Sequence, residues 1–430
     1  MLRKIFVLLF CLVCLVSCQN KPNPMATQLS AELYNLLEAE NYFELKAKFE
    51  SEGSILPEDV RLGYEALVDH YFNKHALSNQ KIDQLLALAD NNLSDTLMNR
   101  IYHAKLMNHI NLYEYADAVG ASDALISTYA SFSDSSEMRD LKNENKIWRA
   151  LSTSPKQEII KNDDADIQLE QDKVGLMNVK TVVGDKTVDF IFDTGANFSV
   201  IVRSKAEELG ANIIKADFYV TAATGAEVSC DLAIIPEMKI NNITIKNPVF
   251  LVMDDKDLSF PQIEYFPSGA VGFPIIQALG ELHFKGSANI FVPKTPVVKN
   301  YNNLALNALT PVIAVKYGND TLIFSFDTGA KSTSLYPLFY QKYHNFIDSN
   351  YTKQTFRSGS AGGILEFEGY IIDSLTLAVA SSSARLDSLK GHIDQLGNDA
   401  RFVHGNFGQD YIQQFDEMVI SFTNSYIEFK

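Results

Sequence analysis

The chain has 430 residues, of which 46% are hydrophobic and 21% are charged, so it can bury two or three separate cores and is not disordered over most of its length. Its formal net charge of −16, without a cluster of Lys and Arg, argues against nucleic acid as a partner because phosphate binding needs a basic surface. The eight His residues show no metal-ligand spacing such as His-Glu-x-x-His, so a metallopeptidase is disfavoured and no metal or other cofactor is expected.

The first residues predict a secretory signal. Arg3 and Lys4 precede an apolar run from Ile5 to Leu15, which is too short to remain as a membrane-spanning helix. Leu15-Val16-Ser17-Cys18 resembles the bacterial lipobox, in which the Cys is acylated and becomes the first mature residue. We therefore expect a lipoprotein signal peptide over residues 1–17, lipid on Cys18 and a tether over residues 18–25. The alternative is an ordinary signal peptide that contains a Cys by chance.

The lipobox resemblance also carries a prediction of location. The residue after the Cys influences sorting in Gram-negative lipoproteins, and Gln19 is not the Asp that retains them at the inner membrane. We therefore expect a protein of the bacterial cell envelope, held by lipid at the outer membrane and facing the periplasm. The membrane would be contacted through this anchor only.

Residues 26–153 are predicted to form an all-α domain of helical hairpins. Apolar residues recur at helical spacing, for example at Leu29, Leu33 and Leu37, and no strongly alternating stretch is present. Pro57 followed by two acidic residues is a helix-start signal, since the ring presets φ and the acids complement the helix dipole. The helix pairs resemble tetratricopeptide-like solenoids, but without a fixed period. A charged, apolar-poor stretch then predicts a linker over residues 154–173.

Beyond the linker the pattern changes to short β-strands, and it occurs twice. Asp193-Thr194-Gly195-Ala196 recurs as Asp327-Thr328-Gly329-Ala330, each at the end of a predicted hairpin. A short helix, a Gly-containing segment, an apolar-Gly turn and a terminal hairpin follow each motif in the same order. The paired ranges are 176–192 and 312–326 for the first hairpins, 204–209 and 337–343 for the helices, 222–226 and 358–363 for the Gly-containing segments, 269–272 and 405–408 for the turns, and 282–292 and 419–429 for the terminal hairpins. We predict a duplication with lobes over residues 174–297 and 311–430, joined by a linker over residues 298–310.

These residues resemble a known family. Residues 174–430 are similar to the two-lobed aspartic peptidases of the pepsin and retropepsin superfamily, and in particular to the bacterial retropepsin-like group. The segment from Phe192 to Ile201 is close to that group's signature, and Asp-Thr-Gly-Ala is its retropepsin form. The resemblance implies a duplicated all-β acid-protease barrel, so that the whole chain is a multidomain α plus β protein. It also implies aspartic endopeptidase activity on a polypeptide substrate, without a cofactor.

The resemblance further implies roles for single residues. Asp193 and Asp327 would be the catalytic pair and would share one proton, because two carboxylates about 3 Å apart cannot both ionise. Thr194 and Thr328 would interlock beneath them. The remaining support for the active-site loops would come from Gly195, Ala196, Gly329 and Ala330, and from the turns at Val271-Gly272 and Phe407-Gly408. Flap candidates are Ala223, Thr224, Gly225, Ser358, Gly359 and Gly362.

Two departures from the family pattern are visible, and alternatives stay open. Asn406 stands where an apolar residue is expected, and Lys331 lies close after the second Asp, where a cation could stabilise a doubly ionised pair. Each Asp could instead cap a β-turn before Gly. The alternative function is a catalytically weak or inactive lipoprotein that binds a peptide or partner with the same fold. The helical domain could recruit substrate, bind a protein partner or occlude the cleft.

Overall fold

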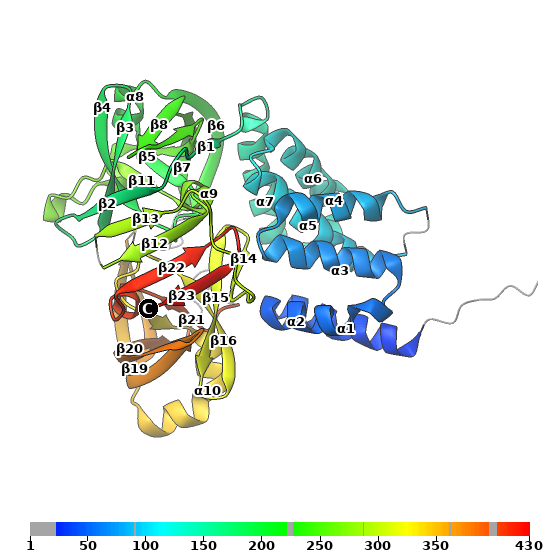
Figure 1. Ribbon diagram of the computed structural model, residues 1–430. Helices are drawn as coiled ribbons and strands as arrows, with labels where there is room; N and C mark the ends of the chain where they lie inside the picture. Colours follow the sequence, from blue (N-terminus) through cyan, green and yellow to red (C-terminus); the bar gives the residue numbers. More distant parts are fainter. Residues whose placement is uncertain (1–22, 90–91, 222–226, 287, 361–362, 395–401) are drawn as a thin grey trace, which may run out of the picture.

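The computed structural model describes residues 23–89, 92–221, 227–286, 288–360, 363–394 and 402–430. A helical domain is followed along the chain by two β-rich lobes (Figure 1). The predicted signal peptide and Cys18 lie outside the described residues. Within the described part of the chain, no helix combines the length and the apolar character that a bilayer crossing requires.

The predicted all-helical N-terminal region is confirmed. Helices that follow one another in the chain pack together, and Leu29, Leu33 and Leu37 turn one buried face of the first helix toward the core. Pro57 directly precedes a helix, as the sequence predicts. The helices are α1 (Pro24–Glu38), α2 (Tyr42–Glu52), α3 (Glu58–Tyr71), α4 (His75–Leu86), α5 (Asp95–Asn111), α6 (Tyr115–Ser127) and α7 (Ser135–Leu151), with short 3-10 turns η1 (Gly53–Ile55) and η2 (Ala130–Phe132).

Both lobes are built mainly from strands. The first lobe contains β1 (Glu158–Ile160), β2 (Ala165–Gln171), β3 (Met177–Val183), β4 (Lys186–Phe192), β5 (Ser199–Val202), α8 (Arg203–Glu208), β6 (Asn212–Thr221), β7 (Glu227–Ile234), β8 (Glu237–Ile240), β9 (Ile243–Lys246), β10 (Val249–Met253), η3 (Asp255–Leu258), η4 (Pro261–Ile263), β11 (Gly269–Val271), α9 (Phe273–Ala278), β12 (Glu281–Lys285) and β13 (Asn289–Val292). The second contains β14 (Leu304–Asn307), β15 (Thr310–Tyr317), β16 (Asp320–Phe326), β17 (Ser334–Leu335), α10 (Pro337–Asn350), β18 (Gln354–Ser360), β19 (Gly363–Val379), β20 (Ser382–His392), β21 (Gly405–Phe407), α11 (Gln409–Ile412), β22 (Glu417–Ser421) and β23 (Tyr426–Phe429).

The two lobes repeat one strand arrangement. The order is β3-β4-β11-β5-β10-β7-β6 in the first lobe and β15-β16-β21-β17-β20-β19-β18 in the second. β11 runs parallel to β4 and antiparallel to β5, as β21 does to β16 and β17. β10 is parallel to β5, and β20 is parallel to β17. The lobes therefore share a topology as well as a motif.

Two segments predicted as linkers instead form strands of the lobes. Residues 154–173 contain β1 and β2, and β2 pairs with both β3 and β13. β2 alternates in sequence, so it buries Ala165, Ile167 and Leu169 on one face although its other residues are polar. Residues 298–310 contain β14, which pairs with β15. Because charged and polar residues surround these strands, the composition of both segments predicts linkers.

The terminal hairpins of the two lobes join in one sheet across the lobe boundary (Figure 1). β12 pairs with β13 and with β22, and β22 pairs with β23. The register of β12 and β22 is symmetric, since Glu281 lies opposite Ser421 and Lys285 lies opposite Glu417. A pseudo-twofold axis through the centre of this strand pair thus relates the lobes, and it makes Glu281 equivalent to Glu417 and Lys285 equivalent to Ser421.

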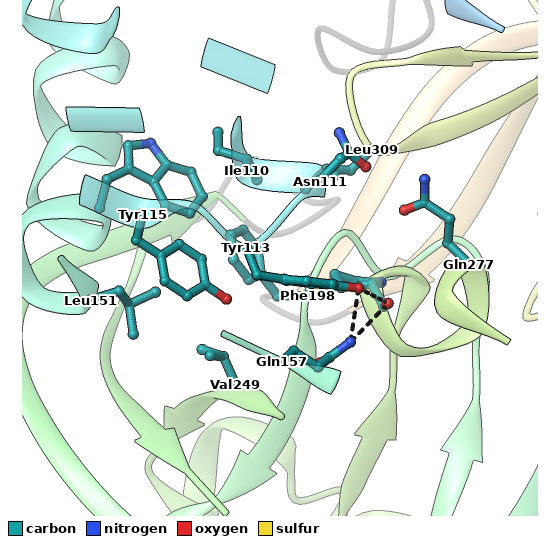
Figure 2. A pocket seen from close by; sticks show the side chains of 12 residues that line it. Ile110, Asn111, Tyr113, Tyr115, Leu151, Gln157, Phe198, Val249, Gln277 and Leu309 are labelled. Carbon is teal, nitrogen blue, oxygen red and sulfur yellow. Dashed lines mark hydrogen bonds between the residues drawn. The ribbon is translucent and has the colours of Figure 1, made fainter. Parts of the chain in front are cut away.

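The helical domain packs against the first lobe. The hydroxyl of Tyr113 donates to the carbonyl oxygen of Pro274 (2.7 Å) and accepts from the side-chain amide of Gln157 (2.8 Å), which Figure 2 shows at the junction. Trp148 of α7 stacks on Phe198 with ring centroids 6.0 Å apart. These side chains surround a cavity of only about 20 Å³, so the junction is closely packed.

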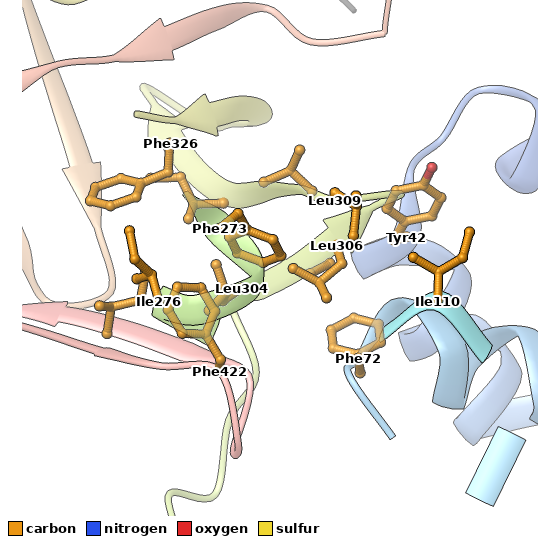
Figure 3. Close-up of a cluster of buried hydrophobic side chains, with 14 of the residues drawn as sticks. Tyr42, Phe72, Ile110, Phe273, Ile276, Leu304, Leu306, Leu309, Phe326 and Phe422 are labelled. Carbon is orange, nitrogen blue, oxygen red and sulfur yellow. The ribbon is translucent and has the colours of Figure 1, made fainter. Parts of the chain in front are cut away.

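The turn between α3 and α4 contacts both lobes. The side-chain amide of Asn73 donates to the backbone oxygen of Phe422 (2.6 Å), and its side-chain oxygen accepts from Gln277 (2.6 Å). The hydroxyl of Ser425 donates to the backbone oxygen of Phe72 (2.7 Å). Beside this turn, apolar side chains of the helical domain and both lobes form one cluster (Figure 3). Its members include Tyr42, Phe72, Ile110, Phe273, Ile276, Leu304, Leu306, Leu309, Phe326 and Phe422.

Candidate active site

Equivalent strands deliver the two repeated Asp residues to the lobe boundary. Asp193 directly follows β4, and Asp327 directly follows β16. The backbone N–H of Asp193 donates to the carbonyl oxygen of Val271 (3.1 Å), and that of Asp327 donates to the carbonyl oxygen of Phe407 (3.2 Å). We call residues 193–196 and 327–330 the Asp loops. The predicted apolar-Gly turns fix the start of each Asp loop through these backbone hydrogen bonds.

A buried hydroxyl holds the glycine of each turn. The N–H of Gly272 donates to the hydroxyl of Ser199 (3.0 Å), and that of Gly408 donates to the hydroxyl of Thr333 (3.1 Å). A Cβ atom at Gly272 would lie 2.4 Å from the carbonyl oxygen of Phe198, so a larger residue does not fit there. Sequence reasoning missed Ser199 and Thr333. The available signal was their equal spacing from the repeated motifs, since each follows its Asp by six residues (199 minus 193, 333 minus 327).

The two Thr residues bind each other across the lobe boundary. The N–H of Thr194 donates to the hydroxyl of Thr328 (3.2 Å), and the N–H of Thr328 donates to the hydroxyl of Thr194 (2.9 Å). The two hydroxyls are also hydrogen-bonded at 3.2 Å. Both side chains are buried, so these bonds are shielded from water and hold the Asp loops in register.

The structure brings the two carboxyl groups together above this Thr pair. The carboxyl group of Asp327 lies against Gly195 of the first loop, and the carboxyl group of Asp193 lies against Gly329 of the second. The N–H of Gly195 donates to Asp193 (2.9 Å), and that of Gly329 donates to Asp327 (2.7 Å). A Cβ atom at Gly195 would lie 2.7 Å from the carboxyl carbon of Asp327, so Gly is needed for the lobes to approach this closely.

Burial raises the pKa of both Asp residues, and the charge of Asp193 raises that of Asp327 further. Desolvation raises the pKa of Asp193, against hydrogen bonds from Gly195, Ala196 and Asp327 that lower it. Desolvation and then the charge of Asp193 raise the pKa of Asp327 to about 7. Because each carboxyl disfavours ionisation of the other, the pair holds a single proton over a range of pH below this value.

Asn406 makes the environment of the two Asp residues unequal. Its side-chain amide lowers the pKa of Asp327, and its side-chain oxygen accepts from the hydroxyl of Ser325 (2.7 Å). In the first lobe the equivalent neighbours are Ala270 and Ile191, which supply no side-chain donor. The only signal for this role in the sequence was that Asn406 replaces an expected apolar residue.

The other predicted site residues are placed as follows. The N–H of Ala330 donates to Asp327 (3.2 Å), and the carbonyl oxygens of Ala196 and Ala330 accept from the first N–H groups of α9 (2.8 Å) and α11 (2.9 Å). Lys331 is exposed, and burial and Asp193 rather than Lys331 dominate the pKa of Asp327. The charge effect predicted for Lys331 is therefore not a main feature of the site.

The predicted flap segments lie mostly outside the described residues. This applies to Ala223, Thr224, Gly225 and Gly362. β6 and β7 lead into and out of the first segment, and β18 and β19 flank the second. Ser358 and Gly359 belong to β18 and pair with β19.

Among the described residues, one cluster has suitable atoms for a metal ion, and it is not near the Asp pair in sequence or fold. His109, Glu114 and Asp117 lie at the turn between α5 and α6 of the helical domain. The ammonium group of Lys156 already binds Glu114 at 2.7 Å. The cluster therefore has a cation from the chain itself as a partner.

Comparison with known proteins identifies the first lobe. The family model described as aspartyl protease matches residues 179–263, which run from β3 to the end of η4 and include Asp193. The chain therefore contains an aspartyl protease domain, preceded by an all-helical region. The match does not extend to the second lobe, whose equivalence to the first comes from strand topology and the repeated Asp loop. No curated protein matches the chain.

Proposed function

We propose that this protein is an aspartic endopeptidase that hydrolyses peptide bonds with a water molecule activated between Asp193 and Asp327. The main support is the close approach of two carboxyl groups that come from equivalent loops of the two lobes. The aspartyl protease match over the first lobe supports the same conclusion independently.

The proposed reaction uses the single proton of the Asp pair. The ionised carboxylate accepts a proton from water as the water oxygen bonds to the scissile carbonyl carbon, and the protonated carboxyl gives its proton to the carbonyl oxygen. The resulting tetrahedral diol then collapses. Its C–N bond breaks as one carboxyl group gives its proton to the leaving amine, and the other, ionised carboxylate takes the proton of a diol hydroxyl, so that the pair again holds one proton. Because the charge of Asp193 raises the pKa of Asp327, Asp327 is the favoured site of the shared proton.

Replacement of either Asp by Asn tests this proposal. We expect Asp193→Asn and Asp327→Asn each to abolish cleavage of an unfolded protein substrate, because neither variant can pass a proton both to and from the substrate. Asp189→Asn is the matched control, since this exposed Asp lies on β4 outside the pair and should leave turnover unchanged. Unchanged turnover in Asp193→Asn would refute the assignment. A wild-type protein that cleaves nothing between pH 3 and 7, yet binds peptide, would indicate the alternative binding function.

We also propose that lipid on Cys18 anchors the protein to a bacterial membrane, with the lobes on the periplasmic side of the outer membrane. The proposal rests on the lipobox-like segment that ends at Cys18 and on Gln19 after it. Cys18→Ala should prevent incorporation of labelled palmitate and should move the protein from the membrane fraction to the soluble fraction. Equal labelling of both proteins would contradict the anchor.

A further inference from the structure

The pseudo-twofold axis reveals a difference between the two sides of the lobe boundary. On the side of the helical domain, Phe273 and Phe422 fill the space between the lobes (Figure 3). Their ring centroids lie 5.3 Å apart at an interplanar angle of 85°, and both side chains are buried. This side of the boundary is therefore closed by an aromatic pair.

The equivalent positions on the other side carry no aromatic ring. Phe273 and Gln409 are the first residues of α9 and α11, and Phe422 and Gly286 directly follow the paired strands β22 and β12. Gln409 therefore takes the place of Phe273, and Gly286, which has no side chain, takes the place of Phe422. A cavity of about 340 Å³ lies at this position, within the size range of sites for small ligands.

The lining of this cavity is mainly apolar and carries no charge among the described residues. The side-chain amide of Gln409 donates to the backbone oxygen of Thr328 (2.9 Å), so this polar group already has a partner. Gln413 is exposed and lies at the rim. Neither Asp193 nor Asp327 lines the cavity. The apolar lining residues include Leu169, Phe192, Ile412, Phe415 and Met418.

We propose that this cavity binds a neutral, apolar small molecule, namely an aromatic or short alkyl compound, which occupies the volume that Phe273 and Phe422 occupy on the opposite side. Among the described lining residues, the absence of Lys, Arg and His disfavours an anionic ligand, and the absence of Asp and Glu disfavours a cationic one. Burial of an apolar ligand against Phe192, Phe415 and Met418 provides the binding free energy.

Ligand binding at this cavity is expected to affect the Asp loops. Thr328 lines the cavity, and its hydroxyl and N–H bind Thr194 across the lobe boundary. A bound molecule therefore contacts the support of the Asp pair without entering the space above it. This effect on activity rests on the proposed peptidase function, whereas the binding itself does not.

Titration of the full chain with N-phenyl-1-naphthylamine, a neutral aromatic fluorophore, tests the proposal. We expect saturable 1:1 binding and a higher thermal unfolding midpoint. Met177→Trp and Ile412→Trp each place an indole in the cavity, so each should weaken binding at least about tenfold. Val182→Trp is the matched control, because this exposed residue lies on β3 like Met177 but does not line the cavity. It should bind the probe like the wild type.

Several results would overturn the proposal. The first is binding of the fluorophore that does not saturate. The second is wild-type affinity in both Met177→Trp and Ile412→Trp when these variants fold. The third is a loss of affinity in Val182→Trp equal to the loss in those two variants. Circular dichroism and thermal unfolding establish that the variants fold. If neither Met177→Trp nor Ile412→Trp folds, crystals of the wild-type protein soaked with bromobenzene decide the question. A bromine peak in this cavity supports the site, and a peak elsewhere or no peak contradicts it. Asp193→Asn should bind the probe normally, so loss of peptidase activity and loss of the ligand site are separate outcomes.

Discussion

At the scale of single residues, the two Asp loops differ in one hydrogen-bond donor. The side-chain amide of Asn406 lowers the pKa of Asp327, and Ser325 orients it, whereas Ala270 and Ile191 hold the equivalent positions beside Asp193. A donor aimed at a carboxylate stabilises its ionised form. The proton of the pair is therefore shared between groups with unequal surroundings.

Asn406→Ala should move the pH dependence of peptide cleavage. Removal of the donor raises the pKa of Asp327, so the loss of activity at high pH should occur at a pH higher by roughly one unit. Profiles of kcat/KM against pH for the wild type and the variant provide the measurement. Ser325→Ala, which only releases the orientation of Asn406, should shift the profile less and in the same direction. An unchanged high-pH limb would rule out this role.

Asp327→Asn should stabilise the protein at neutral pH. The pKa of Asp327 is raised from 3.8 to about 7, so folding favours its protonated form. The stability linked to this group is fully present below the unfolded pKa and is lost as the pH rises through the folded pKa. The variant, which cannot ionise here, should gain on the order of 1–3 kcal/mol at pH 8 and little at pH 4. Urea denaturation across this pH range measures the difference, and a gain that grows toward low pH would contradict the sign.

The sequence allows the Asp pair to be predicted but not all of its surroundings. Asp193 and Asp327 stand in a repeated motif, so duplication alone predicts that they are equivalent. The partners of the pair come from separate segments, and Asn406 lies 79 residues after Asp327 (406 minus 327). Its orientation toward the carboxyl depends on the pairing of β16 with β21, which only the fold provides.

At the scale of elements, α7 of the helical domain binds the edge strand β6. The side-chain amide of Asn143 donates to the backbone oxygen of Tyr219 (2.8 Å), and its side-chain oxygen accepts from the N–H of Tyr219 (3.2 Å). The ammonium group of Lys146 donates to the backbone oxygen of Asp217 (2.8 Å). Because β6 ends the strand order of its sheet, these side chains satisfy backbone groups that a neighbouring strand would otherwise bind.

Asn143→Ala should loosen β6 without unfolding the lobe. The backbone N–H of Tyr219 loses its acceptor, so its hydrogen exchange should become about tenfold faster. Exchange at Val179 and Phe190 in the centre of the sheet should not change. Lys142→Ala, an exposed neighbour on the same helix, is the control and should leave exchange at Tyr219 as in the wild type. Equal exchange in Asn143→Ala would show that α7 does not hold this edge.

The strands that sequence reasoning missed show why element boundaries are hard to predict. β2 has only one apolar face and follows a run of acidic residues, so composition favours a linker. Its place in the lobe comes from pairing with β13, more than 100 residues later in the chain. The hairpins that precede the Asp loops were easier to predict, because buried and exposed residues alternate along their strands and each hairpin contains its own turn.

At the scale of the whole molecule, the turn between α3 and α4 ties the helical domain to the lobes. Asn73 binds Phe422 and Gln277, and its φ of 59° is one that Asn tolerates better than most residues. Asn73 and Phe422 are 349 residues apart in sequence, so no local pattern could have predicted this contact.

Asn73→Ala should destabilise the protein by about 2–4 kcal/mol, because it removes both side-chain hydrogen bonds and adds strain at positive φ. Asn73→Gly removes the same bonds but accepts this φ, so it should cost less than the Ala variant. Denaturant unfolding of the three proteins gives the comparison. Equal stability of all three would exclude a role for this turn in joining the parts.

The pairing of β12 with β22 has a consequence for the growing chain. β22 follows nearly the whole second lobe in sequence, so a nascent chain that has completed only the first lobe leaves one side of β12 without a partner strand. Such an intermediate carries a single Asp loop and cannot yet cut peptides by the proposed mechanism. It also presents an open strand to other polypeptides, which makes it prone to aggregation until synthesis supplies the missing hairpin.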